Sequence, residues 1–268
     1  MDVKKYIKEI NLFLFDMDGT LYLGDRLYDF TKELLETIKV QNKRYLFMTN
    51  NSSKSVEDYV KKLKKLGIEA TSDDFITSSQ ATALYLKDNC PNARLYVCGT
   101  DSLKTELKNF GFEIFEDLDK VDCIVMGNDT ELTFKKLDDV SRLLSTREIK
   151  YIATNPDYVC PTEYGFVPDC GSVCDMIYNA TKKRPVFIGK PEPAMPIIAM
   201  KMTGFAKNET AVVGDRIYTD IKSGLNAGIK NILVLSGETT KEMLKNSPDK
   251  PDLVINSAEE ILKILKDL

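Results

Sequence analysis

Residues 12–21 read LFLFDMDGTL, so four apolar residues lead straight into two aspartates, a glycine and a threonine. An unbroken apolar run that ends in a glycine-containing turn predicts a strand buried on both faces of a parallel sheet. Ligands of such sheets collect beyond the carboxyl ends of the strands, where Asp16 and Asp18 follow the run. Two neighbouring carboxylates repel each other unless a cation compensates their charge. The stretch therefore predicts a metal-assisted catalytic site.

Composition and net charge limit the partners that the chain can have. The 268 residues are 43% apolar and 29% charged, with a formal net charge of −4 at pH 7. This acidic balance argues against a nucleic-acid-binding face. No apolar run approaches the ~18 residues of a membrane span, and the first ten residues lack the apolar centre of a signal peptide. We therefore expect a cytoplasmic protein that binds neither nucleic acid nor membranes.

The chain contains no histidine, which removes several mechanisms at once. Ser-His-Asp and Cys-His nucleophiles, phosphohistidine chemistry and imidazole-ligated zinc all need that residue. The six cysteines form no C-x-x-C pair, so we expect free thiols rather than disulfides or a zinc site. Catalysis must then use carboxylate, hydroxyl or ammonium groups.

Strands and helices alternate along the first part of the chain. Apolar runs predict strands at 12–15 and 45–48, and amphipathic patterns predict helices at 27–40 and 56–66. This order predicts a parallel sheet with right-handed crossovers. Residues 73–77 are expected to form a short connector to the next helix.

A second alternation of strands and helices starts near residue 94 and includes an irregular stretch at 155–171. The pattern SVCD at 172–175 then matches a capping box and predicts the start of a helix. The first pattern resumes at Pro185 and continues to the end of the chain. We therefore expect an α/β fold, a doubly wound, parallel, Rossmann-like sheet with an inserted α/β domain. The expected boundaries are 1–78 and 185–268 for the core, and 79–184 for the insertion.

Reactive side chains follow three of the predicted core strands. Asp16, Thr49 and Asp215 come directly after, or at the end of, apolar runs, and Lys190 follows a glycine in a fourth element. The carboxyl ends of parallel strands meet at one edge of a sheet, so these groups can converge there. Carboxylates with Mg²⁺, together with hydroxyl and ammonium donors, suit a phosphoryl group better than a neutral substrate.

Asp16 with Asp18 after a fully buried strand favours function even when taken alone, but the other residues each have an ordinary structural interpretation. Asp215 or Asp220 alone fits a helix N-cap, Thr49 and Asn50 fit a turn, and residues 189–191 fit a loop with a surface lysine. What favours catalysis is that all of them occur in order at successive strand ends.

Four motifs of this chain resemble those of phosphatases in the haloacid dehalogenase superfamily. They are DMDGT at 16–20, Thr49, Lys190 and GDRIYTD at 214–220. The companion residues TNN at 49–51 and GKP at 189–191 resemble the 4-nitrophenylphosphatase branch, which includes NagD-type nucleotidases and pyridoxal phosphatases. That branch carries a large α/β cap between its second and third motifs, where the inserted block lies.

The resemblance implies an aspartyl-phosphate mechanism. Asp16 would attack phosphorus, and Asp18 would protonate the leaving alcohol and then deprotonate the attacking water. Mg²⁺ would be held by the Asp16 side chain, the main-chain carbonyl of Asp18 and the Asp215 side chain. The implied protein is a Mg²⁺-dependent phosphomonoester phosphatase for a small metabolite such as a sugar phosphate or a nucleotide monophosphate, with 4-nitrophenyl phosphate as a test substrate.

The resemblance also assigns supporting residues. Thr49, the amide of Asn50 and the Lys190 ammonium would hold the phosphoryl oxygens. Asp220 would orient Lys190 or a metal-bound water. Asn51 would be a second residue that supports the site without binding substrate or metal. Within the insertion, the candidates for facing substrate, with turn formation as the alternative, are Asn155, Asp169, Gly171 and Ser172. Analogy with the family also allows a homodimer formed through the cap.

Three alternatives use the same residues differently. A dehalogenase of the superfamily would need neither Mg²⁺ nor Asp18, so Asp18 and Asp215 argue against it. A receiver-like phospho-accepting domain would be smaller, with its acidic pair well before the acceptor strand. A binding protein that has lost turnover would keep the pocket, although every reactive group is present in this chain.

Overall fold

The computed structural model describes residues 2–162 and 164–267. The chain forms two compact units. The larger unit comprises Met1–Thr49, Tyr59–Ile76 and Lys190–Leu268, and the smaller unit comprises Asn50–Asp58 and Thr77–Gly189. The division therefore falls directly after Thr49 and directly before Lys190, two of the residues singled out in the sequence.

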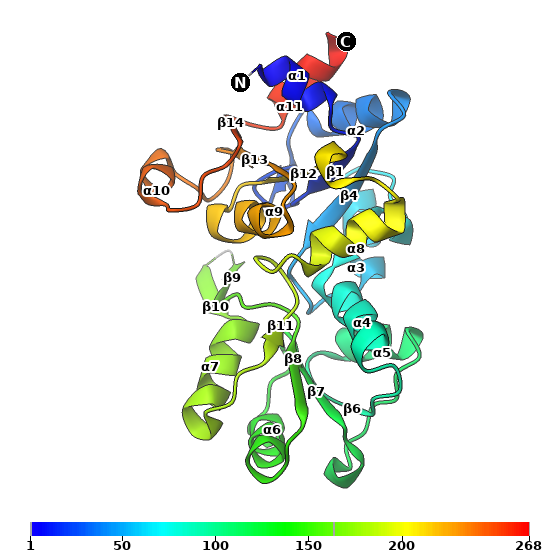
Figure 1. Cartoon of the computed structure of the whole chain (residues 1–268), viewed down its shortest axis with the longest axis vertical. Helices are drawn as coiled ribbons and strands as arrows, with labels where there is room; N and C mark the ends of the chain where they lie inside the picture. Colours follow the sequence, from blue (N-terminus) through cyan, green and yellow to red (C-terminus); the bar gives the residue numbers. More distant parts are fainter. Residues whose placement is uncertain (1, 163, 268) are drawn as a thin grey trace. The chain divides into compact units, whose positions relative to one another are not determined.

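A sheet with the strand order β14-β13-β12-β1-β4-β5 forms the centre of the larger unit (Figure 1). β1 lies between β12 and β4 and is parallel to both, with Leu12 opposite Thr210 and Arg44. All four residues of β1 are fully buried, as the unbroken apolar run predicts. The chain steps outward from β1 in both directions, which confirms the doubly wound arrangement. The strands are β1 (Leu12–Phe15), β4 (Arg44–Thr49), β5 (Phe75–Thr77), β12 (Thr210–Gly214), β13 (Lys230–Val234) and β14 (Leu253–Ile255).

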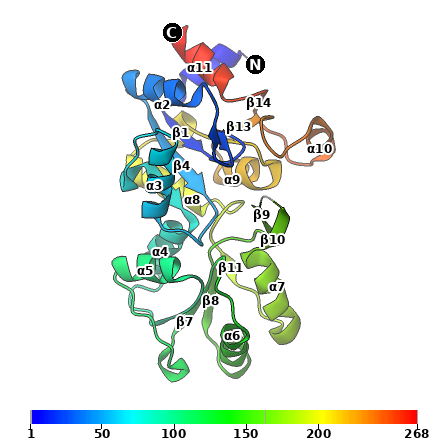
Figure 2. The same ribbon diagram turned by 180° about the vertical axis from the view of Figure 1, so that it is seen from behind.

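Helices cover both faces of this sheet. Figures 1 and 2, taken from opposite sides, show α9 in front of the sheet in one view and α3 in front of it in the other. This is the consequence of right-handed crossovers that run in opposite directions from β1. The helices are α1 (Val3–Lys8), α2 (Thr31–Val40), α3 (Val56–Lys65), α8 (Ala194–Thr203), α9 (Lys222–Ala227), α10 (Lys241–Asn246) and α11 (Glu259–Lys266).

Two segments of the larger unit differ from the sequence-based expectation. The predicted helix at 27–40 begins only at Thr31, because β2 (Tyr22–Leu23) and β3 (Arg26–Leu27) form a hairpin around Gly24. Gly24 has a φ of +59°, a conformation that favours glycine and marks the turn. The expected connector at 73–77 contains β5, a strand too short to show a periodic pattern.

The smaller unit has its own parallel sheet, with the order β11-β8-β7-β6. Its strands are β6 (Leu95–Cys98), β7 (Cys123–Met126), β8 (Lys150–Ala153) and β11 (Val186–Phe187). Its helices are α4 (Ser78–Asn89), α5 (Asp101–Asn109), α6 (Phe134–Thr146) and α7 (Cys170–Thr181). Because β11 pairs with β8, residues 185–189 belong to this unit, and the chain enters the larger unit at Lys190 rather than at Pro185.

The stretch at 155–171, expected to be irregular, contains an antiparallel hairpin of β9 (Val159–Thr162) and β10 (Gly165–Pro168). The capping-box prediction at 172–175 was wrong about where the following helix begins. α7 begins at Cys170, because the Asp169 carboxylate accepts the first main-chain N–H of the helix. Ser172 therefore lies inside the helix, where its hydroxyl donates to the carbonyl of Tyr158.

Among the described residues, no helix has both the length and the apolar character needed to cross a membrane. Within the described ranges, Cys90, Cys98, Cys123, Cys170 and Cys174 take part in no disulfide, as predicted.

Candidate active site

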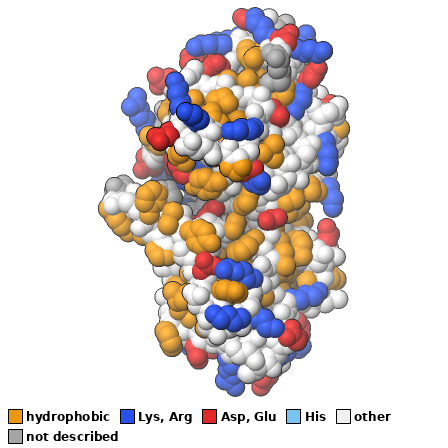
Figure 3. All heavy atoms as spheres, turned by 60° about the vertical axis from the view of Figure 1, so that its left-hand side comes forward, with side chains coloured by type: hydrophobic (Ala, Val, Ile, Leu, Met, Phe, Trp, Pro, Cys, Tyr) orange, Lys and Arg blue, Asp and Glu red, His pale blue; other side chains and the backbone are white. Residues whose placement is uncertain are grey.

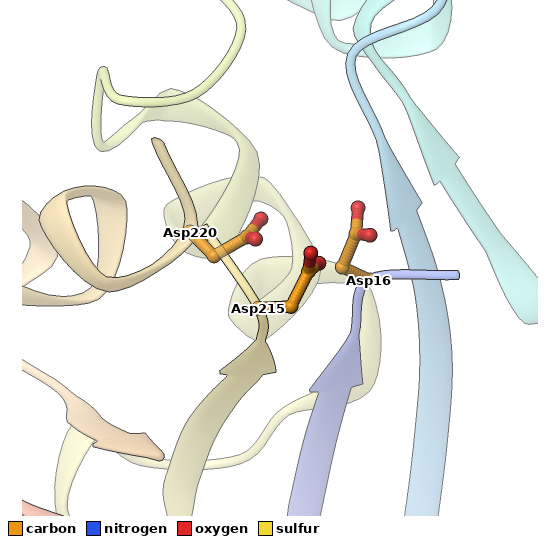
Figure 4. A group of neighbouring side chains, drawn as sticks. All are labelled: Asp16, Asp215 and Asp220. Atoms are coloured by element: carbon orange, nitrogen blue, oxygen red, sulfur yellow. The ribbon is translucent and has the colours of Figure 1, made fainter. Parts of the chain in front are cut away.

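Three carboxylates meet at the carboxyl edge of the larger sheet (Figure 4). Two of them come from neighbouring strand ends, and the third comes from a turn. Asp16 follows β1, Asp215 follows β12, and Asp220 lies in the π-helical turn Ile217–Ile221. One oxygen of each carboxylate lies within 4.8 Å of the others. Figure 4 shows the three groups pointing away from the strands that carry Asp16 and Asp215. The convergence expected from strand polarity alone is therefore present.

Lys190 lies between two of these carboxylates. Its Nζ donates to Asp16 Oδ1 and to Asp220 Oδ1, each at 2.6 Å, and to the carbonyl of Met48 at 3.2 Å. The lysine is only 3% exposed, so these contacts replace water around its ammonium group. One buried cation thus ties the ends of β1 and β4 to the turn that carries Asp220.

The titration behaviour of the cluster reflects burial together with an excess of negative charge. Burial and the charge of Asp220 raise the pKa of Asp16 to about 6, although Lys190 opposes the shift. Burial and the charges of Asp16 and Asp220 raise the pKa of Asp215 to about 7. Burial lowers the pKa of Lys190, but Asp16 and Asp220 raise it overall. The cluster therefore holds more negative charge than one ammonium neutralises, and a divalent cation would offset the remainder.

The donor atoms fit a hard divalent cation such as Mg²⁺. Asp215 Oδ1 is buried without a hydrogen-bond partner among the described residues, while Oδ2 accepts from the main-chain N–H of Glu238 at 2.6 Å. A buried carboxylate oxygen with no partner is costly, unless a ligand satisfies it. Gly19, with a φ of +82°, leaves this space open, because a Cβ there would lie 2.5 Å from Asp215 Oδ2. Carboxylate oxygens are the ligands that Mg²⁺ prefers.

The other expected core residues follow β1 or come at or just after the end of β4 in the chain. Thr49 is the last residue of β4, the strand next to β1. Asp18 is exposed, and its Oδ1 accepts from the main-chain N–H of Gly24 at 3.4 Å. Asn50 belongs to the smaller unit, where its Nδ2 donates to Asp157 Oδ2 at 3.0 Å.

Asn51 makes a local contact, since its Oδ1 accepts from the N–H and the hydroxyl of Ser53 at 2.9 and 2.7 Å. An asparagine that bonds two residues ahead forms an Asx turn, and this turn shapes the chain after Thr49. A supporting role for Asn51 at the site stays a prediction.

Two of the candidate substrate residues, Asn155 and Asp169, belong to a buried polar network in the smaller unit. Asp169 is 5% exposed and accepts from Asn155 Nδ2 at 3.1 Å and Asn128 Nδ2 at 3.2 Å. Gly171 packs so closely that a Cβ there would lie 2.2 Å from the carbonyl oxygen of Pro156. These contacts join loops within the unit, as expected if the residues form turns. Contact with substrate stays a prediction for Asn155, Asp169, Gly171 and Ser172.

Sequence reasoning missed the loop Ser236–Thr239, which follows β13. Ser236 Oγ donates to the carbonyl of Gly19 at 2.7 Å, and the main-chain N–H groups of Glu238 and Thr239 donate to Asp215. The one signal in the sequence was the position of the loop, which directly follows an apolar run that predicts a strand. Its residue types, however, are those of any surface turn.

The chain is similar to known proteins over most of its length. Residues 13–113 match the family model described as haloacid dehalogenase-like hydrolase, and residues 187–261 match one described as HAD-hydrolase-like. The chain is similar to an acid sugar phosphatase of Staphylococcus aureus, with 35% identity over 97% of this chain and 100% of that protein.

Solved structures are similar over nearly the whole chain. A 4-nitrophenylphosphatase from Thermotoga maritima has a TM-score of 0.92 and 41% identity over 96% of this chain and 98% of its own. A glycerol phosphate phosphatase from Mycobacterium tuberculosis, solved in complex with calcium, has a TM-score of 0.87 and 29% identity over 97% of this chain and 76% of its own.

Proposed function

The chain belongs to the haloacid dehalogenase-like hydrolases, and from this premise we propose that it is a Mg²⁺-dependent phosphatase of small phosphorylated metabolites. The observation that carries the proposal is the contact of 2.6 Å between Lys190 Nζ and Asp16 Oδ1, beside the unpartnered oxygen of Asp215. A nucleophilic carboxylate, a cation for the phosphoryl oxygens and a ligand for a metal thus share one sheet edge. The names of the relatives, acid sugar phosphatase and 4-nitrophenylphosphatase, support this reaction class.

In the proposed first step, an oxygen of Asp16 attacks phosphorus while the bond from phosphorus to the ester oxygen breaks. Asp18 gives its proton to the leaving oxygen, which departs as an alcohol. Asp18 is exposed, which suits exchange of a proton with a leaving group. The product of this step is an aspartyl-phosphate on Asp16.

In the second step, Asp18 takes a proton from water, and the water oxygen attacks phosphorus. The bond between phosphorus and Asp16 breaks, inorganic phosphate leaves, and both aspartates return to their starting states. Lys190, Thr49 and the main-chain N–H of Asn50 are proposed to hold the phosphoryl oxygens throughout. Asp220 holds Lys190 in place through its contact of 2.6 Å.

The residues proposed to hold Mg²⁺ are Asp16 and Asp215 through their side chains and Asp18 through its main-chain carbonyl. When bound, the ion supplies positive charge that offsets the charge developing on the phosphoryl oxygens. The neighbour solved with calcium supports a divalent cation in this family. Both carboxylate oxygens of Asp220 already have partners, Oδ1 with Lys190 and Oδ2 with the main-chain N–H of Arg216, so we propose that Asp220 supports the site without binding the ion.

A screen of phosphate esters tests the proposal. The purified chain is incubated with 4-nitrophenyl phosphate, sugar phosphates, glycerol phosphate and nucleoside monophosphates, with Mg²⁺ or with EDTA. We expect Mg²⁺-dependent phosphate release, with sugar phosphates among the substrates because of the relative's name. Release from none of these esters by folded protein would favour the phosphate-binding alternatives, whereas halide release from a haloacid without Mg²⁺ would favour a dehalogenase.

We also propose a homodimer formed through the smaller unit, the cap of the predicted organisation, in a cytoplasmic protein. Large apolar side chains are exposed on and near its hairpin, with Tyr164 at 82%, Phe166 at 68% and Tyr158 at 60% exposure. Figure 3 shows apolar side chains gathered on this part of the surface. Light scattering during size-exclusion chromatography is expected to give twice the chain mass, and a monomer for the variant Phe166→Ser; a monomeric wild type would exclude the dimer.

A further inference from the structure

Glu238 makes contacts in two directions. Its side chain accepts from Arg216 Nε at 2.9 Å through Oε2 and from the Tyr218 hydroxyl at 2.5 Å through Oε1. Its main-chain N–H donates to Asp215 Oδ2 at 2.6 Å. A single residue therefore connects the carboxylate proposed to bind metal with the two side chains that follow it at positions 216 and 218.

Arg216 carries a permanent positive charge on the turn that follows β12. It directly follows Asp215, and its main-chain N–H already donates to Asp220 Oδ2 at 3.0 Å. Guanidinium groups form strong bidentate bonds with carboxylates. Within the described part of the chain, however, its side chain pairs only with Glu238.

Asp215 is oriented by the same loop. Its Oδ2 accepts the Glu238 N–H, and Oδ1 remains buried without a partner among the described residues. Gly237 permits the close approach, because a Cβ there would lie 2.1 Å from Asp215 Oδ2. If the guanidinium were free to turn toward Asp215, it would satisfy Oδ1 and neutralise the charge that a cation needs.

We propose that Glu238 is a positioning residue that holds the Arg216 guanidinium away from Asp215 and so keeps Oδ1 of Asp215 available to a divalent cation. The inference rests on the proposed function, because it requires a cation site at Asp16 and Asp215. It adds to that function a residue that touches neither substrate nor metal. Glu238 affects the affinity for the cation indirectly, through the position of Arg216.

The substitution Glu238→Gln keeps the shape and the main-chain contact but removes the charge that pairs with Arg216. The released guanidinium then competes with the cation for Asp215. Supporting contacts to metal ligands typically change metal affinity by ~10–100-fold. We therefore expect the Kd for Mg²⁺ to rise about tenfold in this variant. The double variant R216Q/E238Q removes the competitor as well, and its Kd is expected to return to within about threefold of the wild-type value.

Isothermal titration calorimetry of the full chain with MgCl₂ tests the proposal without an activity readout. Glu242→Gln is the matched control, because Glu242 is an exposed glutamate on α10, the helix that follows the loop. The Kd of this variant for Mg²⁺ should equal that of the wild type. Circular dichroism and the melting temperature show that each variant is folded. The inference is overturned if E238Q binds Mg²⁺ like the wild type, or if R216Q/E238Q binds as weakly as E238Q.

Asp215→Asn separates failure of this inference from failure of the proposed function. If the wild type binds no Mg²⁺, or if D215N binds it as the wild type does, the proposed cation site is wrong and the inference falls with it. If D215N loses binding while E238Q keeps it, only the role of Glu238 is wrong.

Discussion

Lys190 Nζ lies 2.6 Å from Asp16 Oδ1, joining residues that are 174 positions apart in the chain. Lys190 is 3% exposed, and its second carboxylate partner, Asp220, is fully buried. A buried ammonium group needs such partners, because its hydration is lost on folding. The same contact places a positive charge beside the proposed nucleophile, where phosphoryl oxygens would bind.

Lys190→Met should destabilise the protein strongly. The methionine keeps most of the side-chain length but leaves the carboxylates of Asp16 and Asp220 without their cation. Removing one partner of a buried ion pair typically costs ~3–5 kcal/mol of unfolding free energy. Urea unfolding at pH 7 measures the loss, with Lys241→Met as the control, because Lys241 is exposed at the start of α10. If the unfolding free energy of K190M lay within about 1 kcal/mol of the wild-type value, the contacts of Lys190 with Asp16 and Asp220 would not be important for stability.

Asp18→Asn should slow turnover and accumulate the aspartyl-phosphate. Asparagine cannot accept the proton from the attacking water, so hydrolysis of the intermediate should be slower than its formation. Intact-protein mass spectrometry after mixing with 4-nitrophenyl phosphate should detect one added phosphoryl group. A wild-type rate in this variant would remove Asp18 from acid and base catalysis.

Glu106 should make stability fall as pH rises. Burial, with a contribution from the charge of Glu57, raises its pKa from 4.5 to about 7, and its Oε2 has no partner among the described residues. A folded-state pKa above the unfolded value means that the native state binds more protons between these pH values. The contribution of Glu106 to the unfolding free energy is therefore fully present below about pH 4.5 and is lost as the pH rises through about 7.

Glu106→Gln should remove this part of the pH dependence. Between pH 5 and pH 8 the wild type is expected to lose up to about 3 kcal/mol of unfolding free energy that the variant keeps. Urea unfolding across this range provides the comparison, with the exposed Glu131→Gln as the control in the same unit. Parallel stability curves for E106Q and the wild type would show that Glu106 titrates normally.

The elements that could be predicted from sequence are those whose burial leaves a pattern. β1 and β12 are unbroken apolar runs because helices cover both faces of their sheet. Their polarity then places Asp16 and Asp215 at one edge, and the order of motifs adds Lys190 and Asp220. Asp16 and Asp215 meet in the structure for the reason that the strand pattern supplied, and Lys190 and Asp220 join them from segments outside the strands.

Elements defined by tertiary contacts could not be predicted in the same way. β5 is three residues long and has no periodicity to detect. The start of α7 depends on Asp169, which is held by Asn128 and Asn155 from separate loops and so outcompetes the local capping pattern at Ser172. The contacts of Ser236–Thr239 with Asp215 depend on the order of β12 and β13 in the sheet, which the residue types of the loop do not encode.

Phosphate release from 4-nitrophenyl phosphate by wild type and Asp16→Asn, at saturating Mg²⁺, tests the central claim most directly. Asparagine preserves the shape of the side chain but cannot form the aspartyl-phosphate. The account predicts Mg²⁺-dependent release by the wild type and by the exposed control Asp29→Asn, and a loss of at least about 10³-fold in D16N that remains folded. Release by D16N at the wild-type rate would contradict the assignment of Asp16 as the nucleophile.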